Sequence, residues 1–252
     1  QLKYEWKQAK DLTSEDYLVL RCDYPKDLPY VELPAWKGKR MVLDENIAYL
    51  IGQFLSDGWF EKDNGRFCFF STSSTVIDRV QMALKMVFDY EQTIEGWTYD
   101  ALKNDGSEYT GIAHQLRINR KEINLYLASA MGIDISWKAP TKRVPELFFQ
   151  SPRSVLESLL SGLFDGDGSV HCDRNVIHYG TISPKLADDV QLIMQHLGAL
   201  SRRYVQKQKD LHPHLYQGNF ITPNHDFINL EVRGRFAQKL ARSLTLQNID
   251  KK

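Results

Sequence analysis

Two segments that lie far apart in the sequence end an apolar, helix-like stretch with the same Asp-Gly pair. The first reads Leu50-Ile-Gly-Gln-Phe-Leu-Ser-Asp-Gly58, and the second reads Leu160-Ser-Gly-Leu-Phe-Asp-Gly-Asp-Gly168. Each has a glycine six positions before the final glycine, a small residue two positions before it and an aspartate directly before it. Two copies of one local arrangement predict a chain that is built from two related halves.

The apolar periodicity around these segments predicts the same order of elements in both halves. In the first half, Asp44 caps a helix that ends at Gly58, and strands and helices follow up to Met131. In the second half, Ser151 caps a helix with Pro152 at its first position, and the same order follows. The sequence therefore predicts an α+β fold with two αββαββα halves, 41–150 and 151–252, after a small β-rich N-terminal arm at 1–40.

Small residues at helical spacing mark one face of each of the two Asp-Gly helices. Gly52 and Gly162 lie at the centres of these stripes. Because small residues let two helix backbones approach closely, we expect the two helices to form the interface between the halves at Gly52 and Gly162. We also expect Gly58 and Gly168 to end the helices in the left-handed conformation.

This packing would bring Asp57 and Asp167 together at the C-terminal ends of the two helices. The negative end of a helix dipole is unfavourable for carboxylates, so two of them together favour the binding of divalent cations. Carboxylate and backbone carbonyl oxygens are ligands of Mg²⁺, which commonly acts in pairs on phosphodiesters. Asp57 and Asp167 are therefore candidate catalytic residues and metal ligands, and the neighbouring Ser56 and Gly166 are further candidate ligands.

Both segments resemble the duplicated LAGLIDADG motif of single-chain homing endonucleases, and the second resembles it more closely. Lys142-Arg-Val-Pro145 resembles a stretch before the second motif helix in intein-borne members, and the opening residues 5–20 resemble the stretch that joins an intein splicing module to its endonuclease. The resemblance implies saddle-shaped antiparallel sheets for DNA. It also implies a site-specific, metal-dependent double-strand DNA endonuclease that leaves short 3′ overhangs at a long asymmetric target.

The same resemblance implies catalytic lysines, metal ions and partners. The lysine at the position of Lys142 is catalytic in intein-borne members, and pseudo-symmetry places its counterpart after the last helix, where Lys251 stands. Two or three Mg²⁺ ions are expected, with Mn²⁺ as a substitute. The expected partner is double-stranded DNA, bound by a monomer that needs no other protein. A free-standing chain and one that is fused to, or excised from, an intein splicing module both remain open. Self-splicing is not expected, because the chain neither opens with Cys or Ser nor closes with a His-Asn pair.

Alternating polar residues on two predicted strands are candidate readers of DNA bases. A half-buried strand always has a polar face, but these faces carry residue types that recognise bases in the major groove: Arg for guanine, Gln and Asn for adenine, and Glu for cytosine. Basic residues between 202 and 209 are candidates for phosphate contacts. The full set of DNA-binding candidates is Gln115, Arg117, Asn119, Arg203, Lys207, Lys209, Asn229, Glu231 and Arg233.

The composition neither requires nor excludes a nucleic-acid partner. The 32 basic and 32 acidic residues give a net charge of +0, but they are segregated along the chain, which is compatible with one basic face. The three cysteines form no CxxC pair, so neither a disulfide framework nor a cysteine zinc site is supported. Without a signal-peptide pattern or an apolar run that could span a bilayer, we expect an intracellular protein that is not secreted, in the cytoplasm, nucleoid or nucleus, with no membrane contact.

Other interpretations of these residues are less consistent with the sequence. A calcium loop starting at Asp165 would need Gly and Glu at positions that hold Val170 and Val176. The histidines His212, His214 and His225 are typical of exposed loops rather than a metal cluster. Two functional alternatives remain open. One is an RNA maturase on the same fold, which need not keep both aspartates, and the other is a DNA-binding protein that does not cleave.

Overall fold

The computed structural model describes the chain except for residues 1–4, 18, 21, 23, 25–27, 103–106, 212–213, 217–218, 249–250 and 252. Parts of the predicted arm at 1–40 and His212 therefore lie outside the described residues. The body contains two four-stranded antiparallel sheets, each with helices packed against it. In the described part of the chain, no helix is both long and apolar enough to cross a membrane.

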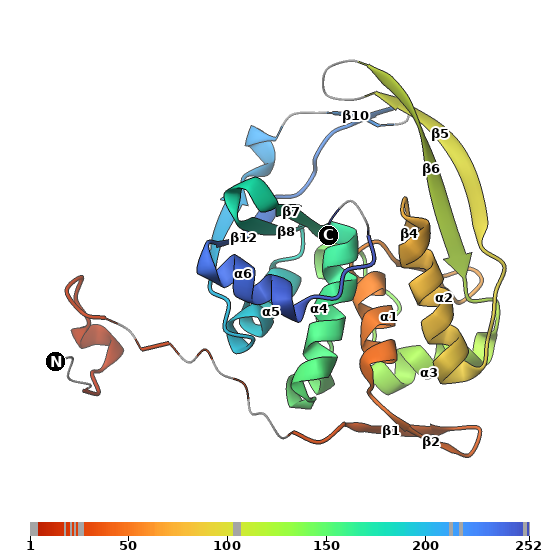
Figure 1. Cartoon of the computed structure of the whole chain (residues 1–252), viewed down its shortest axis with the longest axis horizontal. Helices are drawn as coiled ribbons and strands as arrows, with labels where there is room; N and C mark the ends of the chain where they lie inside the picture. The colour runs from red at the N-terminus through yellow and green to blue at the C-terminus, as the bar shows by residue number, and fades with distance from the viewer. Residues whose placement is uncertain are drawn as a thin grey trace.

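The first half begins with the Asp-Gly helix and continues through one sheet. Its elements are α1 (Glu45–Leu55), β3 (Trp59–Glu61), β4 (Arg66–Ser71), α2 (Ser74–Phe88), β5 (Glu95–Leu102), β6 (Glu108–Arg117) and α3 (Lys121–Met131). The strand order is β3-β4-β6-β5. Strands β5 and β6 form a long hairpin that projects from the body (Figure 1). Asp44 caps α1 as predicted, because its carboxylate accepts hydrogen bonds from the backbone N–H groups of Asn46 and Ile47.

The second half repeats this order. Its elements are α4 (Arg153–Asp167), β7 (Gly168–His171), β8 (Val176–Thr181), α5 (Pro184–His196), β9 (Ser201–Gln206), β12 (Phe227–Arg233) and α6 (Arg235–Ser243). The strand order is β7-β8-β12-β9. A small hairpin, β10 (His214–Tyr216) and β11 (Asn219–Ile221), is inserted before β12 and lies beside β5 (Figure 1). The predicted α+β fold with two αββαββα halves is confirmed.

The residues before α1 contribute one hairpin to the body. Strands β1 (Glu32–Trp36) and β2 (Lys39–Val42) pair with each other, so the arm boundary predicted at residue 40 falls inside this hairpin. Nearer the N-terminus, Tyr24 is buried and donates its hydroxyl hydrogen to the backbone O of Phe149 at 2.8 Å. The chain that leads to α1 is therefore attached to the segment that joins the two halves.

Two predicted features of the helix ends are wrong. Pro152 is the cap residue of α4 and no side chain caps this helix; the hydroxyl of Ser151 donates instead to the backbone O of Leu147 at 3.0 Å. Gly168 is extended, with φ −83° and ψ 158°, and Gly58 is not among the glycines with positive φ. These glycines permit close approach rather than a left-handed turn. A Cβ atom at Gly58 would lie 2.9 Å from a backbone oxygen of the preceding helical turn, and one at Gly168 would lie 2.6 Å from the equivalent oxygen.

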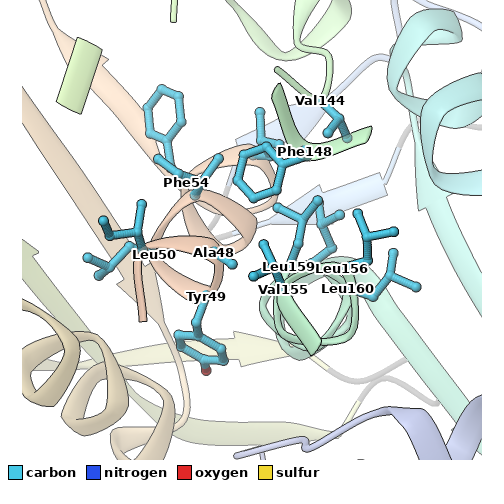
Figure 2. Close-up of a cluster of buried hydrophobic side chains, with 14 of the residues drawn as sticks. Ala48, Tyr49, Leu50, Phe54, Val144, Phe148, Val155, Leu156, Leu159 and Leu160 are labelled. Carbon is cyan, nitrogen blue, oxygen red and sulfur yellow. The ribbon is translucent and has the colours of Figure 1, made fainter. Parts of the chain in front are cut away.

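The core passes from one half to the other across the contact between α1 and α4. Figure 2 shows this cluster, which includes Leu50 and Phe54 from α1 and Leu156 and Leu159 from α4. Val144 and Phe148, from the segment that joins the halves, belong to the same cluster (Figure 2). Because each such side chain stabilises the fold by about 1.5–3 kcal/mol when fully buried, this shared cluster stabilises the packing of the two halves against each other.

Candidate active site at the ends of the motif helices

The motif helices, α1 and α4, pack backbone to backbone at their central glycines. A Cβ atom at Gly52 would lie 2.3 Å from the backbone O of Leu159 and 3.0 Å from the Cα of Gly162. A Cβ atom at Gly162 would lie 2.6 Å from the backbone O of Tyr49. These neighbours are backbone atoms that cannot rotate away, so residues with any side chain would separate the helices. The structure thus brings Gly52 and Gly162 together at the centre of the interface.

Two polar side chains of α1 hold the register of this crossing. Gln53 is buried and donates from Nε2 to the backbone O of Gly162 at 2.6 Å. The hydroxyl of Tyr49 donates to Oδ2 of Asp165 at 2.7 Å. Because both bonds join buried groups from different halves, sliding one helix along the other would leave buried polar atoms without partners, which is costly.

Asp57 and Asp167 lie at the same end of the crossing. Asp167 is the last residue of α4, and Asp57 follows α1 at a distance of two residues. The Oδ2 atom of Asp57 is so close to Gly166 that a Cβ atom there would lie only 2.8 Å from it. The carboxylate from the first half therefore lies against the end of the helix from the second half, next to Asp167.

A lysine holds the carbonyl end of each motif helix. The Nζ atom of Lys142 donates hydrogen bonds to the backbone oxygens of Phe54, Ser56 and Gly58 at 2.9, 3.2 and 2.7 Å. The Nζ atom of Lys251 donates to those of Phe164, Asp165 and Gly166 at 3.2, 2.9 and 2.5 Å. The two lysines occupy equivalent positions, and each offsets the negative end of a helix dipole beside an aspartate.

The pKa values of these four groups are shifted toward neutrality. Burial raises the pKa of Asp167 from 3.8 to about 7, the charge of Asp57 raises it further, and the two lysines oppose the rise. Burial lowers the pKa of Lys142 from 10.5 to about 8, against the attraction of both aspartates. Burial also raises the pKa of Asp57 and lowers that of Lys251. The side chain of Asp167 is exposed, Asp57 and Lys251 are half-buried and Lys142 is buried, so the carboxylates and ammonium groups share a site that opens to solvent at Asp167.

The donor atoms at this site fit a divalent cation such as Mg²⁺. Asp57 and Asp167 supply carboxylate oxygens, and Ser56 and Gly166 supply backbone oxygens that keep a second lone pair while they accept from the lysines. Mg²⁺ usually binds one or two carboxylates and completes its shell with water and phosphate oxygens. The described residues contain no cluster of three or more His, Cys, Asp or Glu that could hold a metal. A cation here would offset both the burial and the charge of Asp57 that raise the pKa of Asp167.

Asp165 anchors the chain that carries Lys251, a role that the sequence analysis missed. Its buried carboxylate accepts hydrogen bonds from the backbone N–H groups of Gln247 and Asn248, each at 2.9 Å. The backbone O of Gln247 in turn accepts from Oγ1 of Thr75 at 2.7 Å. The one sign in the sequence is that the second motif has Asp165 where the first motif has Leu55.

The segment that carries Lys142 is held from the second half. The hydroxyl of Ser183, at the N-terminus of α5, donates to the backbone O of Lys142 at 2.6 Å. The backbone N–H of Val144 donates to Oδ2 of Asp189 at 2.9 Å. Each lysine therefore depends on contacts with both halves, which local sequence patterns do not reveal.

The base-reading candidates of the first sheet are partly engaged with neighbouring side chains. Gln115 and Arg117 lie on the face opposite the buried Leu116, and Gln115 is itself buried. Arg117 forms an ion pair with Glu95 of the adjacent strand β5. Asn119 lies beyond the end of β6, and its side-chain oxygen accepts a hydrogen bond from Arg66 at 2.8 Å.

In the second sheet, Glu231 is the centre of a polar network on the face opposite the core. Glu231 is only 7% exposed. Its carboxylate accepts from Nε and Nη2 of Arg233 at 2.6 and 2.7 Å, from the hydroxyl of Tyr204 at 3.3 Å, and contacts Nε2 of His178 at 3.3 Å. Asn229 lies on the same face. Glu231 therefore holds Arg233 in place and is not the free acceptor that a cytosine reader requires.

The cross-strand register separates Arg203 from the other candidates. Arg203 lies opposite Leu230, whose side chain is in the core, and it forms an ion pair with Asp188 of α5. Among the predicted DNA-binding residues, Arg203 therefore lies on the face of the sheet opposite to that of Glu231. Its neighbour Arg202 is exposed and lies opposite Glu231, on the face that the prediction assigned to DNA.

The two lysines predicted to contact phosphates lie past the end of β9. Lys207 forms an ion pair with Asp226 at 2.9 Å. Lys209 is exposed within the short 3-10 helix Gln208–Asp210. Neither belongs to the regular part of the sheet, so neither has a fixed position on its polar face.

Both halves of the chain are similar to known proteins. A family model described as a LAGLIDADG-like domain matches residues 44–129 and 154–242. The chain is 29% identical over 203 residues to a DNA gyrase subunit of Mycobacterium gordonae, covering 79% of this chain and 33% of that protein. It is 25% identical over 211 residues to DNA-directed RNA polymerase subunit Rpo1C of Methanocaldococcus jannaschii, covering 83% of this chain and 22% of that protein. The chain thus spans a third or less of these two relatives.

Among solved structures, variants of the homing endonuclease I-DmoI match with a TM-score of 0.49 and 14% identity, covering 80% of this chain and 91% of that one. The full-length DUF199/WhiA protein of Thermatoga maritima matches with a TM-score of 0.47 and 11% identity, covering 81% and 56%. The family match has one segment in each half, and each segment begins at its motif helix. The predicted resemblance is confirmed, and the chain belongs to the LAGLIDADG family, with both motifs in a single polypeptide.

Proposed function

We propose that the chain is a metal-dependent, site-specific DNA endonuclease that cuts both strands of a duplex. The observation that carries this proposal is the arrangement at the helix crossing. Each half contributes one aspartate and one lysine to the same site at the ends of the motif helices. A site with two equivalent sets of groups suits a substrate with two antiparallel strands, since each set can serve one scissile phosphate.

In this mechanism Asp57 and Asp167 would hold the divalent ions, together with the backbone oxygens of Ser56 and Gly166. When bound, such ions would polarise the phosphate and lower the pKa of a water molecule. Lys142 and Lys251 fix the ends of the motif helices and place positive charge beside the site where negative charge develops. We expect two or three Mg²⁺ ions, with Mn²⁺ as a substitute.

The polar faces of the two sheets would bind the DNA. Arg117 and Arg233, each held by a glutamate, are preorganised to contact base edges in the major groove. Arg202, Lys207 and Lys209 would contact phosphates. The family resemblance supports a long asymmetric target, short 3′ overhangs and a monomeric enzyme, because both motifs are present in one chain.

The relatives also suggest the setting of the domain. The chain matches only a limited part of the gyrase and RNA polymerase subunits. The limited coverage supports a domain that is inserted within longer proteins, as the predicted relation to inteins implies.

The test is to select cleaved sites from a randomised duplex library with Mg²⁺ present, and then to assay Asp57→Asn and Asp167→Asn on the selected target. Each variant should lose double-strand cleavage but still bind the target in Ca²⁺, because a ligand change removes stabilisation of the transition state and few ground-state contacts. Asp63→Asn is the matched control, since Asp63 is exposed in the turn that follows β3. It should cleave like the wild type.

Three outcomes would contradict the proposal. Cleavage by either active-site variant at a rate near that of the wild type would show that the aspartate is not part of the site. Specific binding of duplex DNA without any cleavage would favour a non-cleaving DNA-binding protein. Preferential binding of structured RNA over every selected duplex would favour an RNA maturase on the same fold.

A further inference from the structure

Tyr179 lies directly beside the proposed cleavage site but is neither one of its candidate metal ligands nor one of its lysines. It belongs to β8 and pairs across the sheet with Gly168, the residue that follows Asp167. Its ring packs against Phe164, in the last turn of α4, with the ring centroids 5.4 Å apart. Its side chain therefore points from the sheet toward the end of the second motif helix.

The hydroxyl of Tyr179 is buried and unpaired. The residue is 0% exposed, and within the described part of the chain its hydroxyl has no hydrogen-bond partner. Burial and the charges of Asp167 and Asp57 raise the pKa of this hydroxyl, so it remains protonated and available as a donor. A buried donor without a partner is unfavourable, and native proteins usually satisfy such groups with another residue or with water.

At the position that matches Tyr179, the first half has a phenylalanine and so no hydroxyl. Tyr179 pairs with Leu230 in the second sheet, and Phe69 pairs with Leu116 at the matching position of the first sheet. Phe69 is equally buried. An aromatic ring alone is thus sufficient for core packing at this position. Core packing therefore does not account for the hydroxyl of Tyr179.

We propose that Tyr179 is a positioning residue of the cleavage site, whose hydroxyl donates a hydrogen bond to a water molecule that enters beside Asp167 with the divalent ion. This inference rests on the proposed function and deepens it. A water molecule at this place would have the polar partners that buried water needs, namely the hydroxyl on one side and the carboxylates of Asp167 and Asp57 on the other. Only one of the two strands would be cut with the help of this bond.

The first test is Tyr179→Phe, which reproduces the residue of the first half. Because the ring is kept, the metal-free protein in EDTA should melt at the same temperature as the wild type or higher. The variant should cut one strand about tenfold more slowly, the effect of one hydrogen bond. The other strand should be cut at the wild-type rate, so nicked plasmid should accumulate.

The second test needs no cleavage. Thermal melting at increasing Ca²⁺ concentration, without DNA, should show that Tyr179→Phe binds Ca²⁺ roughly two- to tenfold more weakly than the wild type. Tyr24→Phe is the matched control. Tyr24 is also a buried residue, but its hydroxyl donates to the backbone O of Phe149, far from the motif helix ends in sequence. That variant should melt at a lower temperature and keep the wild-type response to Ca²⁺ and both strand rates.

The inference is overturned if Tyr179→Phe melts at a lower temperature in EDTA and slows both strands equally, because the hydroxyl would then act in packing. It is also overturned if strand rates and the Ca²⁺ response are both unchanged. A wild-type protein that cuts no DNA would refute the proposed function alone. In that case the Ca²⁺ titration of the two variants still decides whether the hydroxyl belongs to an ion site.

Discussion

Replacing Gly52 with alanine is the sharpest test of the helix crossing on which the candidate site depends. The added Cβ atom would lie 2.3 Å from the backbone O of Leu159, whereas ordinary contacts begin at 3.4 Å. The partner is backbone, so the helices must separate by about 1 Å to relieve the overlap. Overpacking of this kind costs about 3 kcal/mol at the upper end of its usual range.

Alanine also favours a helix over glycine by about 1 kcal/mol. The net loss of stability for Gly52→Ala is therefore about 2 kcal/mol. For a chain of this size, that corresponds to a fall in melting temperature of roughly 4–8 °C. The same separation should move Asp57 away from Asp167 and slow cleavage of both strands.

The matched control is Gly96→Ala in β5. A Cβ atom at Gly96 would meet its nearest neighbour, Nδ1 of His114, at an ordinary distance of 3.6 Å. Its melting temperature should stay within about 2 °C of the wild type, as for most surface substitutions. Differential scanning calorimetry of both variants makes the comparison. If Gly52→Ala melts at or above the wild-type temperature, backbone packing at this glycine does not hold the halves together.

Two further predictions concern pH and DNA recognition. Because the folded pKa of Asp167 is raised from 3.8 to about 7, its protonation stabilises the metal-free protein at low pH, and this contribution is lost as pH rises through 7. Mg²⁺ should therefore raise the melting temperature more at about pH 8 than at about pH 6; an equal rise in both buffers, or the same difference in Asp167→Asn, would contradict this. Arg117→Ala and Arg233→Ala should each relax the preference at one base pair by about 1–3 kcal/mol. Lys207→Ala and Lys209→Ala should weaken the binding of all DNA sequences alike. Each should also reduce the slope of log affinity against log salt concentration by about one. Measuring the affinity for every single-base variant of the target at two salt concentrations separates base-reading residues from phosphate-contacting ones. If the arginine variants weakened binding to all targets equally, neither arginine would read a base.

The parts of the fold that could be predicted from the sequence are those that local patterns encode. The periodic apolar residues of α1, the side-chain cap at Asp44 and the small residues around Gly52 and Gly162 act within a few residues of each other. Since the same patterns occur twice, the order of elements in the second half follows from the first. The helix crossing could also be predicted, because among the described helices α1 and α4 carry the stripe of small residues with an Asp-Gly end.

The features that could not be predicted depend on contacts between distant parts of the chain. Arg203 points toward α5 because of the register between β9 and β12, and a shift of one residue would reverse its face. The position of Lys251 depends on Asp165, more than eighty residues earlier in the chain. Ser151 has the residue type of a helix cap, but its hydroxyl finds the backbone O of Leu147 instead. Residue type alone does not select between such partners.

The same long-range contacts make the two ends of the site unequal. The second half has Asp165 and Tyr179 where the first half has Leu55 and Phe69. Only the second half therefore has a buried carboxylate that anchors its lysine segment and, among the described residues, an unpaired hydroxyl near its aspartate. Since the charge of Asp57 contributes to the raised pKa of Asp167, a change at Asp57 alters the affinity of Asp167 for a cation. The two half-sites are therefore coupled electrostatically but held in place by different residues. This predicts that variants of the second half change the order in which the strands are cut, whereas variants of the shared glycines slow both strands together.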